Sequence, residues 1–229
     1  MNQTDKELLK EVSDSFTEEA EVYNIRKNGE SIERKVNSYI DIITKNDKSG
    51  IDIYVKENTL FGIVHIPVII TESGLTDVVY NDFHIGKNAN VIIFAGCGIH
   101  NDKHKDSEHD GIHRFYLEEG AKVKYVEKHY GEGIGSGKKI LNPTTEIYMK
   151  DSSSMTMDSV QIKGVDDTIR ITKAELGANT TLEISEKILT TGSGTAKTEF
   201  VVDLEVLRKV LLIKNLHQTS PETPSVMLM

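Results

Sequence analysis

The only cysteine of the chain lies beside a concentrated group of histidines. Cys97 is followed by His100, His104, His109 and His113, which are four of the eight histidines in the chain. Thiolate and imidazole are the side chains that bind soft and borderline metals and iron–sulfur clusters. This spacing predicts a site that binds, carries or transfers a metal or a sulfur species.

Each of these residues also has a simpler explanation. Cys97 could accept sulfur, ligate iron or hold zinc, with His100 as a second ligand or proton acceptor, or it could be a small core residue. His109 and His113 are four residues apart, which brings them together on a helical turn or tight loop and separates them on a flat strand. His104 lies among charged residues and is expected to be a mobile surface side chain.

A second polar group follows Cys97 along the chain. Glu127, His129 and Glu132 lie on the next predicted strand and turn, and in a stack of strands they could lie near Cys97 as supporting partners. An exposed polar strand face is an equal alternative. A zinc site would need four ligands in tetrahedral reach. The predicted metal ligands are Cys97, His100, His109, His113, Glu127 and His129, and Cys97 and His100 are the predicted cofactor-binding pair.

Composition limits the classes of function. The chain has 229 residues and a net charge of −9, without a Lys/Arg stripe, which argues against nucleic-acid binding. One cysteine excludes a disulfide within the chain and fits a reducing compartment. The N-terminus does not resemble a signal peptide, and the longest apolar stretch, residues 61–70, is about half the length that spans a bilayer. We therefore expect a soluble, cytoplasmic protein with no membrane partner.

The first 50 residues predict a short helical segment. Apolar residues recur at helical spacing in residues 5–21 and again in residues 31–45, behind a possible Ser31 cap. Residues 46–50 break this pattern. From Ile51 onward, short runs of β-branched and apolar residues predict strands.

A loose repeat follows in the region 51–204. Small-residue turns recur roughly every 30 residues, each between two short strands and with no helical stretch. This predicts a mainly β fold, a right-handed parallel β-helix, whose core is lined by Val91, Val123, Met155 and Leu182. A two-sheet antiparallel sandwich is the alternative, but it would not require the turns to resemble one another. Residues 205–229 form an atypical, partly disordered tail in this prediction.

Several strings of the sequence resemble the SufB/SufD proteins of iron–sulfur cluster assembly, in particular their short single-component form. The resemblance covers roughly residues 20–204. The strings that carry it are the run from Tyr23 to Ser31, Val64–Ile70, Val79–Phe83, Ala95–Asp102, His109–His113, Tyr125–Gly133, Asn142–Pro143 and Gln161–Asp166. The resemblance implies a right-handed parallel β-helix and a role as a scaffold on which clusters are assembled.

The resemblance also implies cargo and partners. A transient iron–sulfur cluster would be the cargo, with Cys97 as sulfur acceptor or cluster ligand, and zinc is the alternative metal. A SufC-type ABC ATPase would be one partner, and a second copy or a SufB/SufD-like pairing another. The chain would not itself be an enzyme. The alternative function is a zinc-dependent or carbohydrate-active β-helix enzyme that uses the same histidines.

The C-terminal tail departs from this family pattern. Family members continue past the β-helix with further strands, another cysteine and a helical domain that docks SufC. This chain leaves the pattern near Leu204 and Glu205. We therefore expect residues 205–229 to be the product of a truncation or frame slip in a longer gene, which would put SufC binding in question.

Overall fold

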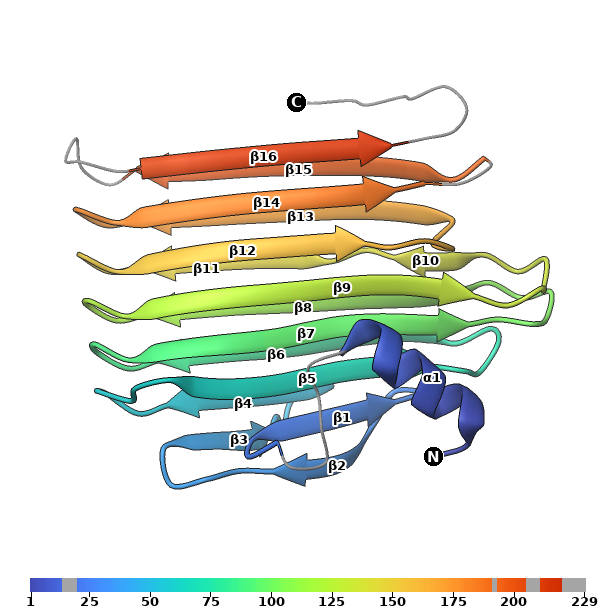
Figure 1. Cartoon of the computed structure of the whole chain (residues 1–229), viewed down its shortest axis with the longest axis horizontal. Coiled ribbons are helices and arrows are strands. Elements are labelled where there is room, and N and C mark those ends of the chain that lie inside the picture. Colours follow the sequence, from blue (N-terminus) through green and yellow to red (C-terminus); the bar gives the residue numbers. More distant parts are fainter. Residues whose placement is uncertain (14–19, 191–192, 205–210, 220–229) are drawn as a thin grey trace.

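The computed structural model describes residues 1–13, 20–190, 193–204 and 211–219. The described strands form two sheets that lie face to face (Figure 1). Sheet A contains, in spatial order, β2 (Glu30–Lys35), β1 (Tyr23–Lys27), β5 (Gly62–Ile70), β7 (Asn90–His100), β9 (Lys122–Glu132), β12 (Ser154–Gln161), β14 (Thr181–Leu189) and β16 (Leu211–Thr219). Sheet B contains β3 (Ile40–Thr44), β4 (Gly50–Val55), β6 (Thr76–Ile85), β8 (Ser107–Leu117), β11 (Thr144–Met149), β13 (Asp167–Leu176) and β15 (Thr195–Leu204), and β10 (Lys139–Leu141) pairs with β8 and β13.

The chain passes from one sheet to the other and back, and each strand pairs in parallel with the strand one coil later. Antiparallel pairing among the described strands is limited to β1 with β2 and β3 with β4, at the N-terminal end of the stack. The result is a β-solenoid of about five turns. The predicted mainly β, parallel β-helix fold is therefore confirmed.

The core consists of inward-facing residues in columns that cross the strands. Val91 pairs with Val123, Val123 with Met155, and Met155 with Leu182, and all four side chains are buried. Because successive residues of a strand point to opposite faces, every second residue points inward. Each strand of the sheet therefore adds one residue to each column. The predicted core column is confirmed.

The turns that lead from sheet B to sheet A contain a residue with positive φ, a backbone conformation that most residues adopt only with strain. Asn88, Gly120, Ser152 and Asn179 have φ values of 56°, 68°, 62° and 56°, each between a strand of sheet B and the next strand of sheet A. Glycine adopts this left-handed conformation without strain, and asparagine tolerates it better than most residues. The small residues that produced the repeat in the sequence are therefore a requirement of the turn.

The short helix α1 (Gln3–Val12) lies against the outer face of sheet A (Figure 1). It begins with a reciprocal capping box between Asn2 and Asp5, and it packs Leu8 and Val12 against Ile69 and Tyr130. The helix predicted over residues 5–21 is thus present in its first part as α1, which ends at Val12 with Ser13 as its C-cap; residues 14–19 lie outside the described part, and residues 20 and 21 are not helical. No described helix has the length and apolar character needed to cross a membrane.

The second predicted helix, over residues 31–45, is wrong. Strands β2 and β3 occupy this region, and β3 buries Ile40 and Ile42 while it exposes Ile43. Isoleucines at positions 40, 42 and 43 fit both a helical and an alternating pattern, and pairing with β4 selects the strand.

The stack of strands continues beyond the predicted boundary at residue 204, because β16 pairs in parallel with β14. Residues 205–210 and 220–229 of the predicted tail lie outside the described residues.

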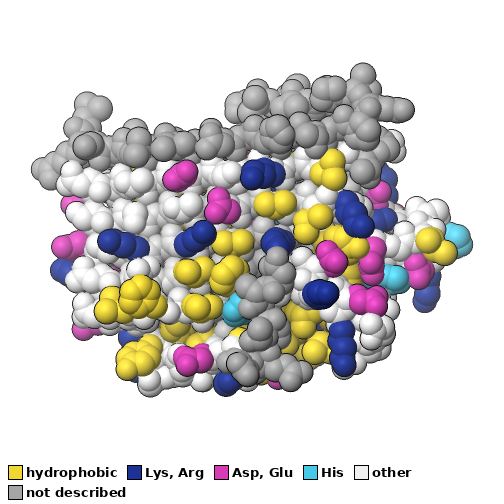
Figure 2. Space-filling model, viewed as in Figure 1, with side chains coloured by type: hydrophobic (Ala, Val, Ile, Leu, Met, Phe, Trp, Pro, Cys, Tyr) yellow, Lys and Arg dark blue, Asp and Glu magenta, His cyan; other side chains and the backbone are white. Residues whose placement is uncertain are grey.

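Figure 2 shows the outer face of sheet A, where hydrophobic side chains gather beside charged ones. The most exposed described hydrophobic residues near β5 are Leu60 and Phe61, at 70% and 81%.

Candidate functional site

The interior of the solenoid is apolar along one part of its width and polar along the other. On β9 the inward residues run from Val123 through Tyr125 to Glu127 and His129. The opposite strand β8 places His109 and His113 inside, before the apolar residues of the main core. Buried polar groups need partners, because a buried unpaired polar atom costs free energy. The polar part of the interior is accordingly a network of hydrogen bonds.

Cys97 lies where the polar and apolar parts meet. Its side chain is 1% exposed and packs with Val68 and Leu141 on one side. It pairs in register with His129 on β9, as the sequence suggested for neighbouring coils. Burial, followed by the negative charges of Asp77 and Glu127, raises the pKa of the Cys97 thiol well above its usual value.

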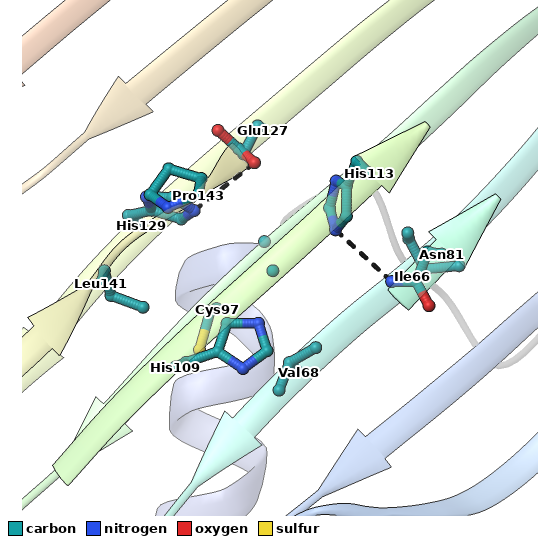
Figure 3. Close-up of a pocket in the computed structure, with 12 residues that line it drawn as sticks. Ile66, Val68, Asn81, Cys97, His109, His113, Glu127, His129, Leu141 and Pro143 are labelled. Carbon is teal, nitrogen blue, oxygen red and sulfur yellow. Dashed lines mark hydrogen bonds and ion pairs between the residues drawn. The ribbon is translucent and has the colours of Figure 1, made fainter. Parts of the chain in front are cut away.

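Cys97 lines a small cavity that the predicted ligands share (Figure 3). The cavity has a volume of about 10 Å³, which is room for one water-sized occupant. Its lining includes Cys97, His109, His113, Glu127 and His129, together with Asn81, Gly96, Gly111 and the apolar residues Ile66, Val68, Leu141 and Pro143. Five of the six predicted ligands therefore come together inside the solenoid.

His109 is held by a buried carboxylate. Its Nδ1 lies 3.1 Å from Oδ2 of Asp77, and Arg26 donates two hydrogen bonds of 2.6 and 3.0 Å to the same carboxylate. Burial would raise the pKa of Asp77, but the bonds from His109 and Arg26 outweigh it and lower that pKa. Because an ionised carboxylate only accepts, Nδ1 of His109 must donate, and the neutral tautomer compatible with this bond is the one with its lone pair on Nε2.

His113 is part of a chain of hydrogen bonds toward Glu127. Its Nδ1 lies 2.6 Å from the hydroxyl of Tyr125, which donates to Oε1 of Glu127 at 2.9 Å. Its Nε2 is 3.4 Å from the amide nitrogen of Asn81. Burial lowers the pKa of His113 to about 4, so this ring is neutral at pH 7.

Both ring nitrogens of His129 have polar neighbours. Arg170 donates to its Nδ1 at 3.1 Å, and its Nε2 lies 3.6 Å from Glu127. Burial lowers the pKa of His129. Arg170 and Ser159 also donate to Glu127, each at 2.7 Å. Burial alone would raise the pKa of Glu127, but His129 and then Arg170 hold it well below its usual value.

Gly111 keeps the space between the two histidines of β8 open. A side-chain carbon at this position would lie 3.2 Å from Nε2 of His113 and 3.4 Å from Nε2 of His109. Both nitrogens therefore border the same small space. Within the described residues, Nε2 of His109 has no hydrogen-bond partner, whereas the ring nitrogens of His113 and His129 all have polar neighbours.

His100 lies apart from this group, on the outer face of sheet A. It is three residues beyond Cys97, and side chains of a strand alternate between faces, so the predicted Cys97–His100 pair is not formed. His100 contacts Glu132 at 3.0 Å and Asp102 at 2.9 Å. Burial alone would lower the pKa of His100, but the bonds and charges of Glu132 and Asp102 together outweigh it and raise this pKa.

Sequence reasoning missed several residues of the polar interior. Asp77 bonds to His109, Tyr125 to His113 and Ser159 to Glu127, and Arg26 bonds to Asp77. None of these four residues was singled out. Arg170 donates to both His129 and Glu127, and this role was not predicted either. The available signal was the occurrence of polar residues at inward positions of strands whose other inward positions are apolar.

The donors do not form a complete metal site. Among the described residues, no three His, Cys, Asp or Glu side chains are arranged so that they could hold one metal ion. Thiol, imidazole and carboxylate are nevertheless the donor types that suit iron and sulfide. A scan of protein-family models, a search of curated proteins and a search of solved structures each found no match for this chain.

Proposed function

We propose that this chain is a scaffold of the SufB/SufD type for iron–sulfur cluster assembly, and that it works with a SufC-type ABC ATPase. One observation carries the proposal: the thiol of Cys97 and the uncommitted Nε2 of His109 line the same cavity. The parallel β-helix agrees with the fold that the sequence resemblance implies. A reducing, cytoplasmic compartment and pairing with a second copy are part of the proposal.

The chemistry begins with the protonated thiol. Because burial raises the pKa of Cys97, an iron ion must displace the thiol proton when it binds, and binding therefore strengthens as pH rises. Nε2 of His109 offers a lone pair to the same ion while its Nδ1 stays bonded to Asp77. Cys97 and His109 are thus the proposed ligands, and Asp77 orients the ring.

The cavity limits what this site can take in the described conformation. A volume of about 10 Å³ accepts one occupant no larger than water, such as a single iron ion. A complete cluster would need side chains of the polar interior to move apart. The proposed cargo at Cys97 is therefore a single ion that is passed on or built upon.

Anaerobic reconstitution with ferrous iron and sulfide tests the proposal. The wild type should bind iron with acid-labile sulfide and develop visible absorption, and Cys97→Ala should lose both. His109→Asn should also lose them, because the asparagine amide can keep the bond to Asp77 but has no Nε2. His100→Ala is the matched control, since this ring lies on the outer face and should leave binding unchanged.

Three outcomes would overturn the proposal. An unchanged spectrum in Cys97→Ala would remove Cys97 from the site. Stoichiometric zinc without labile sulfide, in protein purified anaerobically, would favour a zinc-dependent β-helix enzyme. Absence of binding to a SufC-type ATPase in calorimetric titration would remove the proposed partner.

A further inference from the structure

A ladder of aromatic rings runs across the outer face of sheet B, away from the polar interior. Tyr54, His84, Tyr116 and Tyr148 occupy the same register on β4, β6, β8 and β11. Their ring centroids are 4.6, 5.1 and 5.1 Å apart, and neighbouring planes differ by 8–9°. The rings are thus stacked face to face, and Tyr148 is the last ring of the ladder.

The register continues past Tyr148 without another ring. The next residue in the column is Glu175 on β13, and Asp203 on β15 follows. One face of Tyr148 therefore adjoins carboxylates instead of an aromatic partner. Within the described residues, neither Glu175 nor Asp203 has an ion-pair or hydrogen-bond partner.

A hollow lies beside this end of the ladder. It has a volume of about 170 Å³, and its lining includes Tyr116, Tyr148, Glu175 and Gly177. Gly177 contributes no side chain to fill it. The other charged groups of the lining, Glu118 and Lys150, are paired at 2.7 Å, so Glu175 is the charge left for an occupant.

We propose that this hollow binds the guanidinium group of an arginine side chain from a partner protein. A guanidinium is planar, stacks on aromatic faces and matches a carboxylate with paired donors. It would continue the ladder as its next planar group, with one face on Tyr148 and its N–H groups toward Glu175. A peptide arginine fits better than free arginine, whose own carboxylate would find Lys150 already paired with Glu118.

The same sheet face already contains this combination of groups. Arg114 on β8 has its guanidinium 5.9 Å from the ring centroid of Tyr80 and donates to Glu146 at 2.7 Å. Tyr80 also has the ammonium of Lys48 at 4.6 Å from its ring centroid. At Tyr80 the cations come from the chain itself. At Tyr148 the ring and the carboxylate are present, and among the described residues no cation lies over the ring, although Lys173 lines the adjoining hollow with Tyr148 and Glu175.

The test uses protein with isotope-labelled tyrosine rings and three peptide-like probes: the N-acetyl amides of arginine, citrulline and lysine. The arginine probe should shift the Tyr148 ring signals saturably. The citrulline probe is planar but uncharged, and it should give no saturable shift. The lysine probe should bind more weakly than the arginine probe, because an ammonium lacks the planar fork.

Variants assign the response to the proposed groups. Tyr148→Ala should abolish binding, Tyr148→Phe should keep it, and Glu175→Gln should weaken it by about threefold to tenfold. Tyr54→Ala, which removes the ring at the other end of the ladder, is the matched control and should bind as the wild type does. Equal shifts with citrulline, or unchanged binding in Tyr148→Ala, would overturn the proposal. Iron reconstitution should be unaffected by these variants, so this proposal and the proposed scaffold function fail independently.

Discussion

The buried imidazole of His113 should make the stability of the fold depend on pH in a calculable way. Burial lowers the pKa of His113 to about 4, whereas an unfolded histidine has a pKa of 6.5. Between these two values the unfolded chain binds a proton that the folded chain excludes. The contribution of His113 to the free energy of unfolding is therefore largest above pH 6.5 and decreases as pH falls toward 4. Below pH 4 both states bind the proton, and this contribution does not change further.

The magnitude follows from these two pKa values. The full effect of His113 is about 3 kcal/mol, of which about 2 kcal/mol is lost between pH 7 and pH 5. Replacement by Asn removes the titrating ring, although it also removes the bond to Tyr125 and lowers stability at every pH. The informative quantity is therefore the change in stability with pH.

Urea unfolding of the wild type and His113→Asn at pH 7 and pH 5 measures this change. The wild type should lose about 2 kcal/mol more than the variant over this interval. His100→Asn is a control for which the expected change of stability with pH has the opposite sign. Because Glu132 and Asp102 raise the pKa of His100, its contribution is present below pH 6.5 and is lost as pH rises through the folded pKa. An equal pH dependence in the wild type and His113→Asn would refute the reasoning.

Three further predictions concern single positions. Phe61 has a φ of 58° and is 81% exposed, so Phe61→Gly should stabilise the protein by about 1 kcal/mol in urea unfolding, whereas Leu60→Gly next to it should destabilise it. In Gly96→Ala the added carbon would lie 2.6 Å from the carbonyl oxygen of Lys128 on β9 and 2.8 Å from that of Val12, so hydrogen exchange should become faster both in α1 and at this point of β9. Cys97 should not react with a thiol reagent in the folded protein and should react fully in denaturant, because burial raises its pKa; rapid reaction of native protein would contradict this.

The sequence was sufficient to predict the solenoid because its signal repeats in every coil. Val91, Val123, Met155 and Leu182 each follow a small-residue turn, and the structure places them in one column. The strand pattern at Ile40 was ambiguous, because its isoleucine spacing also fits a helix. In that region only the pairing with β4 decides between the two.

The candidate site could be predicted only in part. The pairing of Cys97 with His129 follows from neighbouring coils, but the inward or outward direction of each side chain depends on register. This is why His100 was expected beside Cys97 and lies on the other face. Asp77 and Arg26 are 51 residues apart in sequence, and no local pattern indicates that they meet.

The alternation of side chains along β7 also limits how this molecule can change over generations. Removal of one residue between Asn90 and Cys97 would turn the sulfur atom out of the interior, toward Val12 of α1, and bring a glycine into its place. Insertions and deletions are harmless to this arrangement only in the connections, such as the neighbouring segments 101–106 and 133–138, which bond to each other outside the strands. Length variation among descendants of this gene should therefore accumulate in these connections and spare the strand that carries the thiol.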